Sequence, residues 1–120
     1  MTPAKRPAAV GPSADLLERV RASLAHLPRV QEKKMFGGIT FMVNGKMCVS
    51  VGKNRIMCRI DPELHDKVVD GRGVRTVVMK GREYRGYVHV DDALVRSTKE
   101  LERWVSMALD ENARLVKAAH

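Results

Sequence analysis

Aromatic residues are scarce in this chain, and cysteine is scarcer still. Two Phe, two Tyr and one Trp make up 4% of the 120 residues, and there are only two Cys. Two thiols cannot supply the dense disulfide framework of a small secreted domain. They form no Cys-x-x-Cys pair, and no histidine pair has zinc-ligand spacing, so we expect neither a metal nor a cofactor.

Long apolar runs are also missing. The longest, such as residues 39–43, are strand-sized, far below the roughly 18 residues of a membrane span. Residues 1–12 contain Pro, Ala and two cations but no apolar core of a secretory signal, and we predict a disordered tail there. A single domain is expected over residues 13–120, in the cytoplasm and without membrane contact.

Positive charge is what the sequence has in excess. The formal net charge is +8, and residues 29–59 carry +6 of it while residues 71–90 carry +4. Residues 60–70 and 91–120 are net acidic, so the excess lies in the two segments that we predict as β. The positive electrostatic potential of such segments favours a polyanion or an acidic protein surface as partner, although a basic surface can also serve solubility alone.

Helix signals mark three segments. Ser13 can cap a helix over residues 14–26, whose leucines and valines recur at helical spacing. Asp61-Pro62 reads as the cap and first position of a short helix over residues 62–69. Ser97 and Glu100 form a capping box that opens a long helix to about residue 117.

Five strands are predicted between these helices, over residues 39–43, 46–51, 56–60, 74–80 and 83–90. Asn44-Gly45 is a strong type I′ hairpin signal between the first two, and residues 30–36 form an extended lead-in. The order α-β-β-β-α-β-β-α predicts an α+β fold, with helices packed on an antiparallel five-stranded sheet.

The predicted hairpin registers place apolar side chains on both faces of the sheet. The Asn44-Gly45 turn pairs Met42 with Met47 and Thr40 with Val49, and the next turn pairs Val51 with Ile56 and Val49 with Cys58. One face then carries Met42, Met47, Val49, Val51, Ile56, Cys58 and Ile60. The opposite face carries Ile39, Phe41, Val43, Cys48 and Met57.

A sheet with one solvated face alternates more cleanly than this, so the second face must be covered by a helix of the chain or by a partner. We predict a homodimer that buries Ile39, Phe41, Val43, Cys48 and Met57 against a second copy. A monomer with helices on both faces is the alternative. In this register the two cysteines fall on opposite faces, which argues against a disulfide and for two small buried hydrophobes, whereas a three-residue turn would place them directly opposite each other.

Residues 35–47, which begin Met-Phe-Gly-Gly, resemble the N-terminal domain family of the competence regulator TfoX (Sxy). Gly-Tyr-Val-His-Val at residues 86–90, followed by a helix with Leu101 and Trp104, fits the same family, so the resemblance spans residues 14–115. It implies a fold similar to the secretion chaperones and a role in transcriptional regulation through contact with an unknown protein partner. The chain corresponds to the first domain of full-length members, and the family supplies no catalytic residues.

Met35, Phe36, Gly37 and Gly38 could form a recognition loop, but a structural role is the commoner one for such a segment. In that interpretation Phe36 anchors the core and the glycines permit a tight or bulged entry into the strand.

Two further function classes compete with a protein-binding module. Nucleic-acid binding would use the cations of the β segments, namely Lys33, Lys34, Arg72, Arg75, Lys80, Arg82 and Arg85. The few aromatics weaken any stacking platform for single strands, and no helix-turn-helix or zinc finger is present. A small enzyme using Cys58 with His65 or His89 lacks any supporting signature, so we expect no catalysis.

Overall fold

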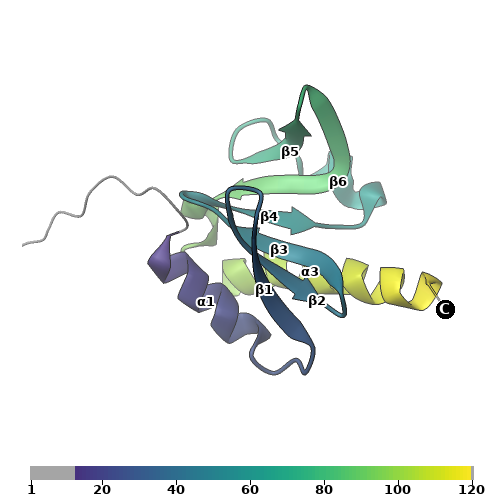
Figure 1. Ribbon diagram of the computed structural model, residues 1–120. Helices are drawn as coiled ribbons and strands as arrows, with labels where there is room; N and C mark the ends of the chain where they lie inside the picture. The colour runs from purple at the N-terminus through teal and green to yellow at the C-terminus, as the bar shows by residue number, and fades with distance from the viewer. Residues whose placement is uncertain (1–12, 120) are drawn as a thin grey trace, which may run out of the picture.

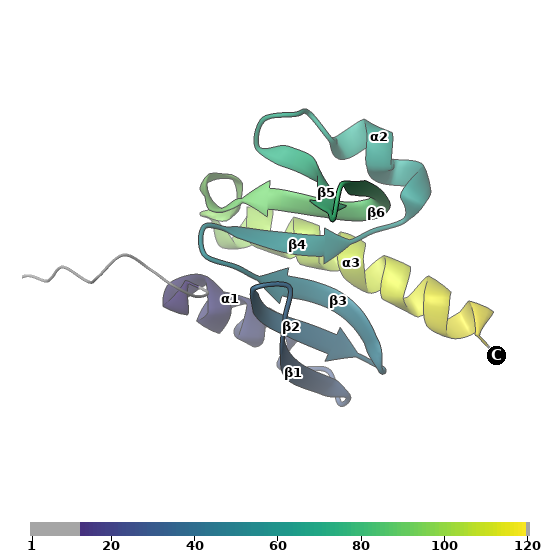
Figure 2. The ribbon, with the colours of Figure 1, turned by 45° about the horizontal axis from the view of Figure 1, so that its top comes forward.

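The computed structural model describes residues 13–119 as an open antiparallel sheet with its two long helices on one face (Figure 1; Figure 2). The sheet has six strands in the order β1-β2-β3-β4-β6-β5. The elements are α1 (Ala14–Leu24), β1 (Val30–Met35), β2 (Gly38–Val43), β3 (Lys46–Val51), β4 (Arg55–Arg59), η1 (Pro62–Leu64), α2 (His65–Val68), β5 (Val74–Met79), β6 (Arg82–Asp91), η2 (Asp92–Val95) and α3 (Thr98–Ala118).

The mixed α+β class and the antiparallel sheet are confirmed, but the prediction of five strands is wrong. The segment predicted as an extended lead-in is β1, which pairs with β2 over its whole length, from Val30↔Val43 to Met35↔Gly38. β1 is an edge strand whose residues after Val30 are all exposed, so it needs no apolar alternation. Charged side chains on such a strand also discourage pairing with other chains, which is why its sequence does not resemble a strand.

Both long helices begin at the predicted caps and pack on the same side of the sheet. Ser13 Oγ accepts from the Leu16 N–H at 3.2 Å, and Ser97 Oγ accepts from the Glu100 N–H at 3.1 Å. The Arg19 guanidinium in α1 donates to the carbonyl oxygens of Val95 and Arg96 at 2.6 and 3.0 Å, which ties α1 to the end of η2, just before α3. None of the helices within residues 13–119 is long and apolar enough to cross a membrane.

A β-bulge in β3 sets the two faces of the sheet. Met42 pairs with Met47 as predicted, but Phe41 pairs with Val49, which leaves Cys48 as an extra residue. The predicted pairing of Thr40 with Val49 is therefore wrong, because Thr40 lies opposite Ser50. The predicted pairs Val51↔Ile56 and Val49↔Cys58 are confirmed. The extra residue lets Cys48 and Val49 face the same side, so strand alternation reverses at this point.

The main core lies between the helices and the inner face of the sheet, and it absorbs most of the predicted partner surface. Phe41 and Cys48 are 0% exposed and Val43 is 3% exposed, all within the same buried cluster, against which Ile39 packs. Met57 lies on the other face. Ile39, Phe41, Val43 and Cys48 therefore do not form an exposed surface for a second copy, because α1 and α3 cover the face that they share, and the bulge brings Val49 onto that same face. Cys48 and Cys58 share this core as free thiols, not opposite faces.

A second irregularity bends the tip of the β5–β6 hairpin away from the sheet, as Figure 1 shows. Thr76 pairs with Val88 while the next residue, Val77, pairs with Tyr84, so three residues of β6 are extra. Gly86, in the middle of them, has φ +92°, and its carbonyl oxygen accepts from the Ile60 N–H at 2.7 Å. The bend brings Tyr84 and Tyr87 to the same side of the sheet.

Gly38 and Gly37 differ in what a side chain would meet, which gives a sharp test of the β1–β2 hairpin. A Cβ at Gly38 would lie 2.0 Å from the Val51 carbonyl oxygen, whereas a Cβ at Gly37 (φ +75°) meets nothing within 4 Å. We expect Gly38→Ala to lower the free energy of unfolding by about 3 kcal/mol, through steric conflict with backbone. Gly37→Ala should cost only about 1 kcal/mol, from its left-handed conformation. Urea unfolding checks both, and equal losses would contradict the close packing of β2 on β3.

Candidate functional site

The face of the sheet turned away from α1 and α3, here called the outer face, carries a second hydrophobic cluster. Its centre is buried, with Met47, Met57 and Val77 at 7%, 6% and 1% exposure, although no long helix covers it. Half-buried side chains surround this centre, namely Met42, Met79, Tyr84 and Tyr87. Four of the seven methionines of the protein therefore lie on the outer face.

Two tyrosines and two arginines form a row along the outer face. The Tyr84 and Tyr87 rings meet edge to face, with centroids 6.1 Å apart. The Arg59 guanidinium lies 5.3 Å from the centroid of Tyr87, and that of Arg82 lies 5.9 Å from the centroid of Tyr84. No carboxylate within residues 13–119 lies within 4.0 Å of either guanidinium, so the rings hold both cations without neutralising them.

A second cross-strand row lies on the same face and is more polar. Ser50 pairs with Met57, Met57 with His89, and His89 with Arg75. Burial, then the nearby Arg55 and Arg75 charges, lower the pKa of His89 to about 4, so this imidazole is neutral at physiological pH. Arg75 donates to Asp91 at 3.1 Å.

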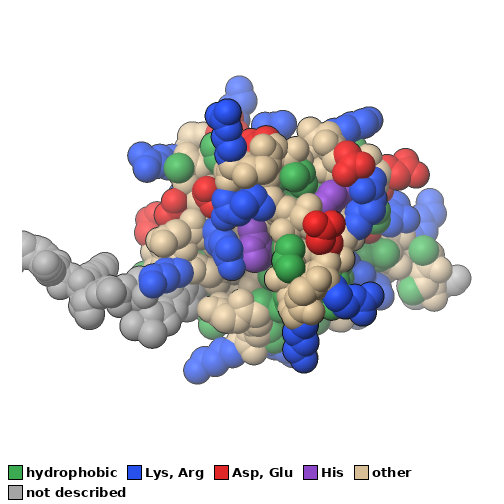
Figure 3. All heavy atoms as spheres, turned by 90° about the horizontal axis from the view of Figure 1, so that it is seen from above, with side chains coloured by type: hydrophobic (Ala, Val, Ile, Leu, Met, Phe, Trp, Pro, Cys, Tyr) green, Lys and Arg blue, Asp and Glu red, His purple; other side chains and the backbone are tan. Residues whose placement is uncertain are grey.

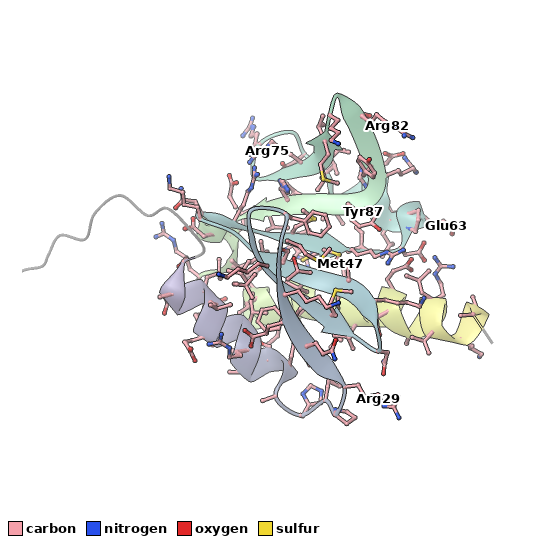
Figure 4. The ribbon with its side chains drawn as sticks, in the orientation of Figure 1. Arg29, Met47, Glu63, Arg75, Arg82 and Tyr87 are labelled. Atoms are coloured by element: carbon pink, nitrogen blue, oxygen red, sulfur yellow. The ribbon has the colours of Figure 1, made fainter. Side chains whose placement is uncertain are left out.

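The outer face therefore carries more cations than carboxylates. Strand alternation places Lys33, Arg55, Arg59, Arg75 and Arg82 on it with Asp91. Figure 4 shows Met47 and Tyr87 near the middle of the molecule, with Arg75 and Arg82 toward the β5–β6 hairpin and Arg29 at the far end. In Figure 3, Lys and Arg side chains outnumber Asp and Glu over the surface seen from above.

The Met35-Phe36-Gly37-Gly38 segment forms the tight turn between β1 and β2. The prediction that Phe36 anchors the core is wrong, because its side chain is 42% exposed. Phe36 also has φ +58°, a conformation that costs an aromatic residue free energy. The two-residue turn places Phe36 in the left-handed region, where its side chain points away from the core.

The seven predicted nucleic-acid contacts do not form one track. Lys33, Arg75 and Arg82 lie on the outer face, but Arg75 is paired with Asp91, and Arg85 is paired with Asp66 at 3.0 Å. The others are dispersed: Lys34 shares a strand face with Glu32, which binds Arg21 of α1, while Arg72 and Lys80 lie in turns.

Sequence reasoning missed Arg55 and Arg59 as surface residues of this face. They alternate with Met57 along β4, and that period of two could have identified them.

The predicted Cys and His candidates for catalysis have structural surroundings. Burial raises the pKa of the Cys48 thiol to about 12 and raises that of Cys58 further, so neither is a ready nucleophile. The Gly86 N–H donates to Nδ1 of His65 at 2.9 Å, and His65 Nε2 lies 2.8 Å from the Thr76 hydroxyl. His65 thus holds the bend in β6. Over residues 13–119 no three His, Cys, Asp or Glu side chains are grouped to hold a metal ion.

The TfoX N-terminal domain family matches residues 22–112. The match begins inside α1 and ends inside α3, so it includes the entire sheet and both of its faces. No curated protein and no solved structure matches the chain.

Buried His65 and half-buried His89 predict a loss of stability in mild acid. Burial lowers the pKa of His65 and of His89 below the ordinary 6.5, so the unfolded chain binds these protons more readily than the folded chain. The contribution of the two neutral imidazoles to the free energy of unfolding is complete above pH 6.5 and is lost as the pH falls toward about 4.

The Gln side chain stays neutral, so over that pH interval we expect His89→Gln to lose ~1 kcal/mol less free energy of unfolding than the wild type. Urea unfolding at a series of pH values measures this difference. His26→Gln, at an exposed position, should keep the wild-type profile. If the stability of His89→Gln and of the wild type fell in parallel with pH, His89 would not be a source of the acid sensitivity.

Proposed function

Because the chain belongs to the TfoX N-terminal domain family, we propose that it is a non-enzymatic regulatory module that acts in transcription by contacting a protein partner. Family membership supports the regulatory role. The contact surface is the outer face, and the observation that carries this assignment is the pair of unneutralised guanidinium groups, Arg59 and Arg82, beside a methionine cluster. Such a combination of apolar centre and charged edge is typical of protein-binding surfaces.

The surroundings of the candidate nucleophiles support a binding role over catalysis. Cys58 is fully buried with a raised pKa, and both ring nitrogens of His65 are used in hydrogen bonds that hold β6. We also propose a cytoplasmic location and a fold akin to the secretion chaperones, the latter supported by element order and family membership.

Nucleic-acid binding is the second candidate, and the net charge of +8 favours it. The dispersal of the cations and the ion pairs of Arg75 and Arg85 count against it. If phosphates are bound, a mobility-shift titration at low salt should show a complex that weakens steeply as salt is raised. Absence of a complex at tens of micromolar protein would remove this candidate.

A homodimer remains a prediction, although the surface first expected for it lies in the main core, with the exception of Met57. Joining two outer faces would bring the unneutralised Arg59 and Arg82 groups of both copies into one interface, and this concentration of like charge opposes such contact. Light scattering over a micromolar concentration series tests the oligomeric state, and a mass near 13.4 kDa throughout would exclude the dimer.

The proposed function predicts capture of a partner through the outer face. The tagged wild-type chain should recover a stoichiometric protein from lysate of its own cells, and the double variant Arg59→Glu/Arg82→Glu should lose it. Two charge reversals at the edge of an interface weaken binding by about tenfold or more.

Arg29→Glu/Lys117→Glu is the matched control. It makes the same change in net charge at two exposed positions, Lys117 in the last turn of α3 and Arg29 before β1, which Figure 4 shows far from Arg82, and it should retain the partner. Equal recovery with both double variants would place the contact elsewhere, and recovery of no partner by the wild type would contradict the function itself.

A further inference from the structure

We infer that the outer face binds an acidic amphipathic segment of a protein, one with apolar side chains along one side and carboxylates flanking them. This inference rests on the proposed function and adds the chemistry of the partner. Two independent features of the outer face carry it: the methionine-rich hydrophobic cluster at its centre, and the arginines that stack on tyrosine rings without a carboxylate partner.

The hydrophobic cluster at the centre of the outer face, here called the methionine floor, is apolar and adaptable. Met47, Met57 and Val77 are nearly fully buried and provide a dry base, while Met42 and Met79 beside them are partly exposed. Methionine has an unbranched, polarizable side chain that repacks around partners of different shape, and it is common on surfaces that accept amphipathic segments. An apolar stripe of a partner would therefore complete this cluster.

The arginines on the outer face are positioned for carboxylates. Tyr87 and Tyr84 hold the guanidinium groups of Arg59 and Arg82 at 5.3 and 5.9 Å from their ring centroids. Stacking on a ring leaves the N–H donors at the guanidinium edge available, and a carboxylate can accept two of them at once. These cations flank the methionine floor, which matches a segment whose acids flank its apolar stripe.

The same geometry disfavours single-stranded nucleic acid. Stacking of bases requires open aromatic faces, but Arg59 covers a face of Tyr87, Arg82 covers a face of Tyr84, and the two rings pack edge to face against each other. Thioether and methyl groups offer nothing to phosphates. A polyanion would meet the arginines yet leave the apolar floor unused.

The test follows the methionine ε-methyl groups by NMR in the full chain. The probe is a synthetic helix-forming peptide of about 18 residues, with Leu on one side and Glu on the other. Comparison probes are a scrambled peptide of the same composition, a version with Lys in place of Glu, and oligo(dT) of similar length. Met107, in α3 against the main core, is the internal control.

With the acidic probe we expect shifts at Met42, Met47, Met57 and Met79 and none at Met107. Arg59→Glu/Arg82→Glu should weaken binding by about tenfold or more, whereas Arg29→Glu/Lys117→Glu should change it by less than about twofold. The scrambled and Lys peptides should bind at least about tenfold more weakly than the acidic probe.

Three outcomes would overturn the inference: no shift of the four methyl groups at about 1 mM acidic probe, equal binding of the Lys or scrambled peptide, or tighter binding of oligo(dT) at the same methyl groups. Each is distinguishable from failure of the proposed function. A cellular partner that is captured through Arg59 and Arg82 but carries no acidic amphipathic segment would leave that function standing and remove only this inference.

Discussion

One extra residue in β3 determines what each face of the sheet presents. Cys48 has no partner in β2, so Met47 pairs with Met42 on one face while Val49 pairs with Phe41 on the other. Without it, Val49 and its partner Cys58 would share a face with Met42 and Met47. The bulge places Val49 beside Phe41 under the helices and leaves Met42 and Met47 on the outer face.

A second constraint, at the other end of the sheet, completes the outer face. The His65 imidazole accepts the Gly86 N–H where three extra residues interrupt the pairing of β6 with β5. The resulting bend brings Tyr84 and Tyr87 into edge contact, and their rings hold Arg82 and Arg59 in turn. The shape of the outer face thus depends on the buried, neutral His65, which links that shape to pH.

Family membership and the outer face support the proposed function in different ways. The family match covers the whole sheet and indicates a regulatory domain, but it does not say which face makes contact. Burial accounts for the two thiols, and hydrogen bonding accounts for His65, so the side chains that first suggest chemistry serve the fold. What remains unaccounted for by the fold is the combination of cations and methionines on the outer face.

Local sequence determined the elements: the caps at Ser13 and Ser97, the Asn44-Gly45 turn, and the α+β order could all be predicted because each depends on neighbouring residues. Only tertiary structure decided that residues 30–35 are a strand, since an exposed edge imposes no apolar pattern. It also decided the faces. Ile39, Phe41, Val43 and Cys48 share one face as predicted, but α1 and α3 cover that face, so these residues lie in the core and not at an interface. The bulge at Cys48, which no distinctive residue marks, adds Val49 and Cys58 to the same core. Pairing across strands, which strand-by-strand alternation does not encode, fixed that result.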